Sequence, residues 1–560
     1  MKAFFKFVFA LSVTAIIFSS CARKNETGKM IPKTAMIVAQ VNTKSLGDKV
    51  SWNDVKQTNW YRKVYSDTAT PEWRKKILDN PGASGMDFDK ELIFFSEKGT
   101  GNDTYLVVEG TVKNEKDFEQ FNKNFDPAQT IKKEGEVNLL ILKDKNVVGW
   151  NGKSFAYVMN AATTSSEMYS FDSTNQPPVS PKDNSDELSA ACAKLFSLSS
   201  DSNLEKDEKF TDLLKENGDI HVWQNTEEIV KNSPSMGMLG MLKLDVFLKN
   251  NISTYTVNFD KGKIDVDQKG YVSKELTDVL KKYLDGRINT DMIKNIPSKN
   301  VFAILAANFK AEGLTELIKL TGADGMINTY AQQMGFTLDD FAKSTNGDLM
   351  LAFKDFKMKA DSFNYKDGLG NEMASGKFNK PGFNYIFSVG VGDKPSLQKL
   401  IDAGKKIASQ LGKDSVIHYA MNDKIFVLSN SDTLTNQYIS GNNNQFDFTN
   451  KINGHPIGFF IDFQKVLSVL AAEPATNLHS RAMVDQSIKI WNNLFFTGGD
   501  YKNGAFTGNT EINMVDQNTN SLKQLNLYVD EIFKIREAER TRNVNRSDSV
   551  LAPPMAGKMK

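Results

Sequence analysis

Residues 31–41, IPKTAMIVAQV, decide the fold, because a diverged copy of this stretch recurs at residues 296–307, IPSKNVFAILAA. In both copies an Ile-Pro pair precedes a short apolar run, which is a pattern typical of a strand that follows a turn. Self-similarity over a long interval indicates repeated structural units. We therefore expect two tandem repeats, each of which opens with this strand.

The elements predicted after these opening strands follow the same order in both halves of the chain. The first half predicts a strand at 105–112 and a helix at 115–125, and the second half predicts a strand at 385–391 and a helix at 395–411. A two-strand segment follows each helix. Similar helical segments close the two halves, at Leu276 to Leu284 and at Leu522 to Val529. This shared order supports an internal duplication.

Two hairpin signals indicate that the strands pair in antiparallel fashion. Residues 254–259 and 263–267 alternate between polar and apolar side chains and flank the turn Asp260-Lys261-Gly262. The dipeptide Asn151-Gly152 separates two other apolar runs. Because helices and strands do not follow a strict βαβ order, we predict an α+β fold of two diverged repeats, each with an antiparallel sheet and packed helices.

The composition of the chain sets the domain boundaries. Residues 165–186 hold three prolines among Ser, Asn and Asp, so we predict a long loop inside the first repeat. The polar end of the chain, with Pro553-Pro554, predicts disorder. The resulting assignment is a signal peptide at 1–20, a lipidated tether at 21–30, a first repeat at 31–290, a second repeat at 291–541 and a disordered tail at 542–560.

The N-terminus has the pattern of an export signal. Lys2 and Lys6 provide positive charge, and residues 7–18 are uncharged and largely apolar. This run is shorter than the roughly 20 residues that a membrane-spanning helix needs, but it suits the core of a signal peptide. Polar residues fill 22–29, which predicts a flexible tether.

The run Phe18-Ser19-Ser20-Cys21 resembles the lipobox of bacterial lipoproteins, although Phe18 stands where Leu is usual. The resemblance implies cleavage between Ser20 and Cys21 and acylation of Cys21, which would anchor the chain to a membrane. A secretory signal with a chance cysteine is the alternative. Because Ala22 replaces the Asp that resembles an inner-membrane retention signal, we expect an outer-membrane location, either periplasmic-facing or surface-exposed.

The start of the mature chain resembles an uncharacterised family of envelope lipoproteins from Bacteroidota. Its members similarly begin with Ile-Pro-Lys and continue with Asn-x-Lys-Ser-Leu, here at 31–33 and 42–46. The resemblance implies a cell-envelope protein with a domain of unknown function, and it transfers no catalytic residue. Exported proteins of that phylum also resemble one another in O-glycosylation after Asp, which makes Thr68, Ser173 and Ser549 candidate acceptors.

Charge and cysteine content restrict the function classes. The chain has 560 residues, is 40% hydrophobic and carries a formal charge of +1, whereas a nucleic-acid-binding protein needs a basic excess. With Cys21 acylated, Cys192 has no partner for a disulfide. Cys192 lies in an apolar helical stretch, so we expect a buried inert thiol.

No local motif predicts catalysis, a metal or a cofactor. The four histidines are scattered, and no two are spaced i, i+4. We therefore expect a non-enzymatic, membrane-anchored envelope lipoprotein that binds or scaffolds a protein or a glycan, with the ligand unknown. The alternative is a glycan-acting hydrolase whose two carboxylates converge only in the folded chain. An exposed aromatic patch would favour binding, and a pocket with two carboxyl groups would favour hydrolysis.

Overall fold

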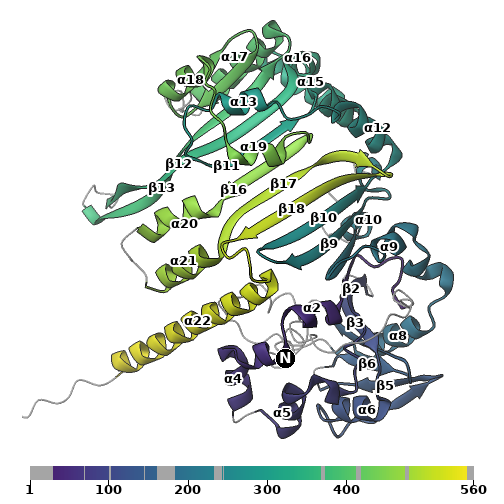
Figure 1. Cartoon of the computed structure of the whole chain (residues 1–560). Helices are drawn as coiled ribbons and strands as arrows, with labels where there is room; N and C mark the ends of the chain where they lie inside the picture. Colours follow the sequence, from purple (N-terminus) through teal and green to yellow (C-terminus); the bar gives the residue numbers. More distant parts are fainter. Residues whose placement is uncertain are drawn as a thin grey trace, which may run out of the picture.

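The computed structural model describes residues 30–67, 70–99, 103–143, 145–160, 183–231, 243, 245–366, 372–410, 418–472 and 478–551. Within these residues, 18 strands form one sheet in which every pairing is antiparallel (Figure 1). Helices pack on both faces of this sheet. The prediction of an α+β fold with antiparallel strands is confirmed.

The strands divide between the two halves of the chain. The first half contributes β1 (Ile37–Val41), β2 (Leu92–Lys98), β3 (Thr104–Thr111), β4 (Lys132–Glu134), β5 (Val137–Ile141), β6 (Val147–Trp150), β7 (Ser154–Asn160), β8 (Ile220–Asn225), β9 (Ile252–Asp260) and β10 (Lys263–Tyr271). The second half contributes β11 (Val301–Asn308), β12 (Thr345–Lys366), β13 (Glu372–Val391), β14 (His418–Met421), β15 (Ile425–Ser429), β16 (Ile457–Asp462), β17 (Trp491–Lys502) and β18 (Ala505–Met514).

The pairings give the same strand order outwards from the middle of the sheet. One side runs β10-β9-β8-β1-β2-β3-β7-β6 and ends with β5 and β4. The other side runs β18-β17-β16-β11-β12-β13-β15-β14. The two opening strands that match in sequence, β1 and β11, therefore occupy equivalent positions. Strands β10 and β18 meet in the middle, from Lys263 opposite Asn513 to Gly270 opposite Phe506.

Helices connect the strands, and one long helix follows the last strand. Those of the first half are α2 (Thr43–Lys49), α3 (Trp52–Lys56), α4 (Asn59–Ser66), α5 (Glu72–Asp79), α6 (Glu115–Lys123), α8 (Ser185–Phe196), α9 (Glu208–Leu213), α10 (Thr226–Lys231), α11 (Asp245–Leu248) and α12 (Lys274–Tyr283), with 3-10 turns at Pro81–Ser84, Ser200–Ser202 and Leu204–Lys206. Those of the second half are α13 (Thr290–Lys294), α14 (Ala311–Leu320), α15 (Asp324–Met334), α16 (Leu338–Ser344), α17 (Lys394–Gln410), α18 (Asp432–Ile439), α19 (Asp447–Ile452), α20 (Phe463–Ala472), α21 (Leu478–Ile490) and α22 (Ser521–Leu551).

Both predicted hairpins are confirmed. Strands β9 and β10 pair around the turn at Asp260-Lys261-Gly262, where Gly262 has a φ of 67° that favours glycine. Strands β6 and β7 pair around Asn151, whose side-chain Oδ1 accepts hydrogen bonds from the backbone N–H groups of Lys153 and Ser154. Turn chemistry therefore fixed the local pairing.

Two of the predicted boundaries fall inside helices. The border at 290/291 falls inside α13, whose Met292 and Ile293 lie in the hydrophobic core of the second half. Helix α22 runs to Leu551, past the predicted start of the tail at 542. The signal peptide, most of the tether, most of the loop at 165–186 and residues 552–560 lie outside the described residues.

The middle of the sheet is polar on one face and apolar on the other. On the polar face, Asn509 donates hydrogen bonds to Asp265 (2.6 Å) and Asp267 (2.9 Å), and Lys263 contacts both Asp265 and Glu511. On the apolar face, a cluster packs beneath α21 and α22, with buried members Ile264, Ile490 and Met514. Side-chain contacts on both faces therefore support the junction of β10 with β18.

Helix α22 ties the end of the second half to the first half. The carboxylate of Asp530 accepts hydrogen bonds from the backbone N–H of Asn59 (2.6 Å), from the Asn59 side chain (2.7 Å) and from the backbone N–H of Trp60 (3.3 Å). These donors lie at the N-terminus of α4, where N–H groups lack partners within the helix and a negative charge is favourable. Asp530 thus caps a helix more than 400 residues away in sequence.

Replacing Asp530 with Ala should lower the free energy of unfolding by about 2 kcal/mol, because partly buried donors at the start of α4 lose their charged acceptor. Urea denaturation measures the effect. The matched control is Glu531→Ala on the same helix, because Glu531 is exposed and pairs with Lys534. That control should change the free energy by less than about 0.5 kcal/mol. Equal effects of the two variants would contradict the capping role.

A row of buried polar side chains crosses the first half. Gln40 lies opposite Ile93 on one side and His221 on the other, and Glu109 lies opposite Ile93 on the next strand. Among the described residues, Gln40 Oε1, Glu109 Oε2 and His221 Nδ1 have no hydrogen-bond partner. Burial raises the pKa of Glu109 to about 8, so this carboxyl is protonated in the fold at neutral pH.

The folded protein should therefore lose stability as the pH rises from about 4.5 towards 8. In that window the unfolded chain releases the Glu109 proton while the folded chain retains it, which costs up to about 1.4 kcal/mol per pH unit. The variant Glu109→Gln should lack this slope and should match the wild type only at low pH. Denaturation at several pH values tests this, with the exposed Glu134→Gln as control. The same slope in wild type and E109Q would refute it.

Candidate functional site

The site residues predicted from sequence are not brought together among the described residues. Ser20, Cys21, Thr68 and Ser173 lie outside those residues, and Ser549 lies in α22 with its side chain outside the description. Each therefore stays a prediction. Cys192 is fully buried, and burial raises the pKa of its thiol to about 12, which keeps it in the unreactive thiol form.

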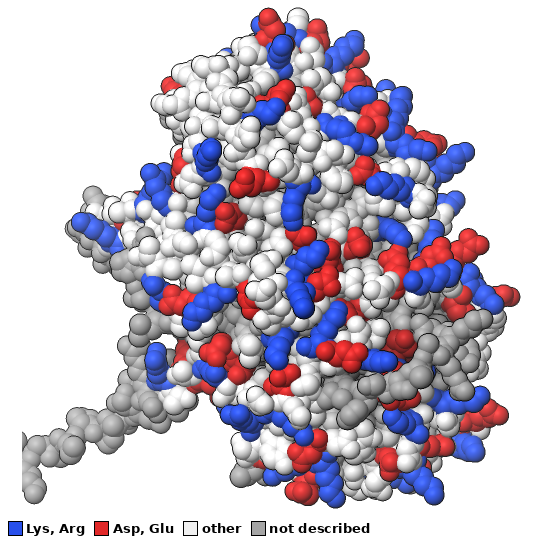
Figure 2. Space-filling model, in the orientation of Figure 1, with Lys and Arg blue, Asp and Glu red and all other residues white. Residues whose placement is uncertain are grey.

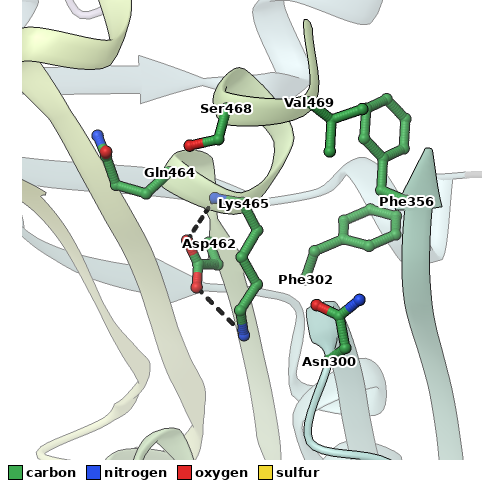
Figure 3. A pocket seen from close by; sticks show the side chains of 8 residues that line it. All are labelled: Asn300, Phe302, Phe356, Asp462, Gln464, Lys465, Ser468 and Val469. Carbon is green, nitrogen blue, oxygen red and sulfur yellow. Dashed lines mark hydrogen bonds and ion pairs between the residues drawn. The ribbon is translucent and has the colours of Figure 1, made fainter. Parts of the chain in front are cut away.

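A pocket of about 350 Å³ opens between α20, the start of β11 and the middle of β12. Figure 3 shows the side chains of Phe302 and Phe356 beside Val469, with polar residues around them. The lining consists of Asn300, Phe302, Phe356, Asp462, Gln464, Lys465, Ser468 and Val469.

A bulge in β12 shapes one wall of this pocket. Asp355 has a φ of 54°, and the pairing register of β12 with β13 shifts between Lys354 and Lys357. The Asp355 backbone N–H donates to Asn300 O (3.0 Å), and its carboxylate accepts from the Asn300 side chain (3.2 Å). Because a bulge re-aims the following side chain, Phe356 meets Phe302 edge to face at 5.5 Å between ring centroids.

Three polar side chains of the pocket, those of Asp462, Gln464 and Lys465, are engaged within the protein. Asp462 accepts a hydrogen bond from the Lys465 backbone N–H (3.0 Å) at the start of α20, and it pairs with Lys465 Nζ (3.4 Å). Lys465 Nζ also donates to Val301 O (2.8 Å). Gln464 donates its amide to Ile488 O and Trp491 O. The walls left for a ligand are therefore the two aromatic rings, Val469 and Ser468.

The aromatic surface continues from the pocket onto the sheet. Phe353 lies 6.1 Å from Phe302 and 5.6 Å from Phe383, measured between ring centroids. Phe383 is 39% exposed to solvent. We call Phe302, Phe353, Phe356 and Phe383 the phenylalanine surface. A surface of this kind suits contact with an apolar group.

A second titratable cluster lies at the start of β16. His455 Nδ1 is 2.7 Å from Asp500 Oδ2, and Arg287 pairs with the other oxygen of Asp500 at 3.4 Å. The Asp500 carboxylate therefore contacts both His455 and Arg287, which come from segments far apart in the sequence. These contacts hold the segment before β16 against β17, and the cluster contains one carboxylate.

The described residues contain no group of three or more His, Cys, Asp or Glu side chains that could hold a metal ion. Among the same residues, no helix has both the length and the hydropathy needed to cross a bilayer. Figure 2 shows basic and acidic side chains interspersed over the visible face of the molecule, in line with the near-neutral formal charge.

The fold and the pocket define an α+β protein built on one long antiparallel sheet, with a pocket beside α20 that is lined by aromatic and polar side chains. A family model described as Domain of unknown function (DUF4836) matches residues 28–365, more than half of the chain, and the protein belongs to this family. Membership in a family of unknown function is thereby confirmed. No curated protein and no solved structure matches the chain.

Sequence reasoning missed this pocket for a physical reason. Its residues come from three separate segments, near 300, at 356 and at 462–469. No local spacing connects them, because they meet through the pairing of β11 with β12 and β16. The one local signal is the helix-capping pattern of Asp462 before Lys465, which predicts a helix start rather than a pocket.

Proposed function

We propose that this protein is a bacterial envelope lipoprotein that is anchored in the outer membrane through acylated Cys21 and has a non-catalytic binding or scaffolding role. The observation that carries this proposal is the pocket beside α20, where Phe302, Phe356 and Val469 offer apolar contact while the side chains of Asp462, Gln464 and Lys465 are bonded within the protein. Such a pocket suits an apolar side chain of a protein partner or the C–H face of a sugar ring.

The state of the pocket's ionisable groups supports a binding role over catalysis. A general acid or base must reach the substrate with a free lone pair or proton. Asp462 instead serves the start of α20 and Lys465, and Lys465 serves Val301 O. Either side chain would have to break these internal hydrogen bonds before it could contact a substrate.

The alternative of a glycan-acting hydrolase needs two carboxyl groups about 5–10 Å apart beside the substrate. The pocket is lined by one carboxyl group, that of Asp462. The cluster of His455 and Asp500 likewise contributes one carboxylate, which Arg287 shares. Binding is therefore the function that we favour.

We further infer that the two halves arose by tandem duplication. The support is the matching strand order on the two sides of the sheet, together with the recurrence of the Ile-Pro strand at β1 and β11. In the first half the opening strand β1 lies between β2 and β8, and in the second half β11 lies between β12 and β16. Such agreement at eight successive positions is unlike the varied orders that antiparallel sheets allow.

Replacing Cys21 with Ala should prevent acylation and move the protein from the membrane fraction to the soluble fraction, because the acyl chains supply the anchoring energy. Incorporation of labelled palmitate and cell fractionation measure the two effects. The matched control is Cys192→Ala, which removes a buried thiol and should leave both acylation and fractionation unchanged. Acylation of C21A at the wild-type level would rule out the anchor.

Replacing Phe356 with Asp should abolish capture of a partner by the tagged, membrane-anchored protein, because the pocket would then present an uncompensated charge. Affinity capture with mass spectrometry measures this, beside the wild type. The control is Tyr419→Asp, since Tyr419 is an exposed aromatic residue on β14, away from the pocket. A partner or glycan retained equally by F356D would show that the pocket is not its binding site.

A further inference from the structure

Strands β12 and β13 extend as a two-stranded ribbon beyond the sheet (Figure 1, left). Pairing of β11 with β12 ends at Lys354, and pairing of β15 with β13 begins at Ile386. We call residues 357–366 and 372–382 the arm. The equivalent hairpin of the first half has strands of 7 and 8 residues, whereas β12 and β13 have 22 and 20. The arm is therefore a feature of the second half alone.

The edge of the arm on β13 is unsuited to pairing with another strand. The Asn430 side chain accepts from the Tyr385 N–H and donates to Phe383 O, so these two residues face outward from the ribbon. Pro381 occupies the next outward-facing position, where it offers no N–H group. Proline at this position is a device that prevents strand addition. A partner that contacts a face of the arm does not meet this obstacle.

One face of the arm concentrates lysines. Lys359 lies directly opposite Lys380, and Lys357 lies two residues along the same face. Like charges opposite each other in an antiparallel pair are unfavourable. Asp361 pairs with Lys380 and is the one acidic residue among the arm's described side chains. Lys357 and Lys359 therefore leave an excess of positive charge on this face.

The same face carries an aromatic side chain. Phe378 lies opposite Asp361, two residues from Lys380, and it is 45% exposed. Gly382, opposite Lys357, leaves room for the Lys359 stem, because a Cβ atom there would lie 2.6 Å from Lys359 Cδ and Cε. Figure 2 shows Lys or Arg side chains on this projection. We call Lys357, Lys359, Lys380 and Phe378 the lysine face.

We propose that the lysine face binds the surface of a membrane containing anionic phospholipid. This proposal rests on the proposed anchoring of the chain at Cys21, which would hold the arm near a bilayer. Clustered lysines are attracted to anionic headgroups, and an exposed phenylalanine ring can insert at the boundary between headgroups and acyl chains. A second copy of this chain would present the same lysines and be repelled. An uncharged glycan would leave the lysine excess uncompensated.

The test uses the mature chain from residue 21 with Cys21→Ala, so that no acyl chain contributes to binding. The probe is a vesicle of phosphatidylglycerol and phosphatidylcholine, compared with a vesicle of phosphatidylcholine alone. We expect sedimentation with the anionic vesicle that weakens as salt is added. The triple variant Lys357→Gln, Lys359→Gln, Lys380→Gln should bind about 100-fold more weakly, at about fivefold per lysine.

The matched control is Lys405→Gln with Lys406→Gln, which removes lysines from α17 outside the arm and should leave binding unchanged. A second measurement places a polarity-sensitive fluorophore on the variant Phe378→Cys. The fluorophore should label this cysteine selectively, because Cys192 is buried. Its emission should shift to the blue with anionic vesicles, whereas a label on Lys133→Cys of β4 should not shift.

Two outcomes would overturn the proposal. One is equal binding to both vesicle types, and the other is anionic-vesicle binding that survives the triple variant, which would point to another surface. If the acylated wild type still fractionates with membranes while the mature C21A chain binds no vesicle, the lysine face is not a lipid site although the anchor stands. Failure of acylation would instead remove the anchor and leave the vesicle result unaffected.

Discussion

Backbone hydrogen bonding between β10 and β18 is the constraint on which the rest of the structure depends. Each half, taken alone, would end in a long strand whose outer N–H and C=O groups had no partner. Pairing these two strands satisfies both edges at once and turns two sheets into one. The polar ladder around Asn509 and the apolar cluster around Ile264 then make this junction continuous with the layers on either side.

The helices that follow these two strands also connect the two halves, through contacts at the surface of the molecule. Helix α12 follows β10 and packs on α14 of the second half, whereas α22 follows β18 and packs on α2 and α4 of the first half. Each half therefore contributes its last helix to the other. The cap that Asp530 places on α4 is the most specific of these contacts. Because the exchange is reciprocal, neither half has a complete surface layer by itself, and we expect them to unfold as one unit.

Local chemistry determined what could be predicted from the sequence. The hairpins at Asp260-Lys261-Gly262 and Asn151-Gly152 follow from turn residues, and the common order of elements follows from two similar opening strands. The pairing of β10 with β18 could not be predicted, because residues such as Asp267 and Asn509 carry no local signal of their contact. The pocket was equally hidden, since Phe356 reaches Phe302 through a bulge whose Asp355 has an uncommon positive φ.

The candidate surfaces lie where the two halves differ in structure. In the first half, β2 ends at Lys98, whereas β12 runs to Lys366. The longer strand supplies Phe356 to the pocket and forms one strand of the arm. The shared sheet does not need this extension for its own pairing. The proposed contact with an anionic membrane gives a reason for an arm with opposed lysines, which weakens its own pairing and occurs in one half only.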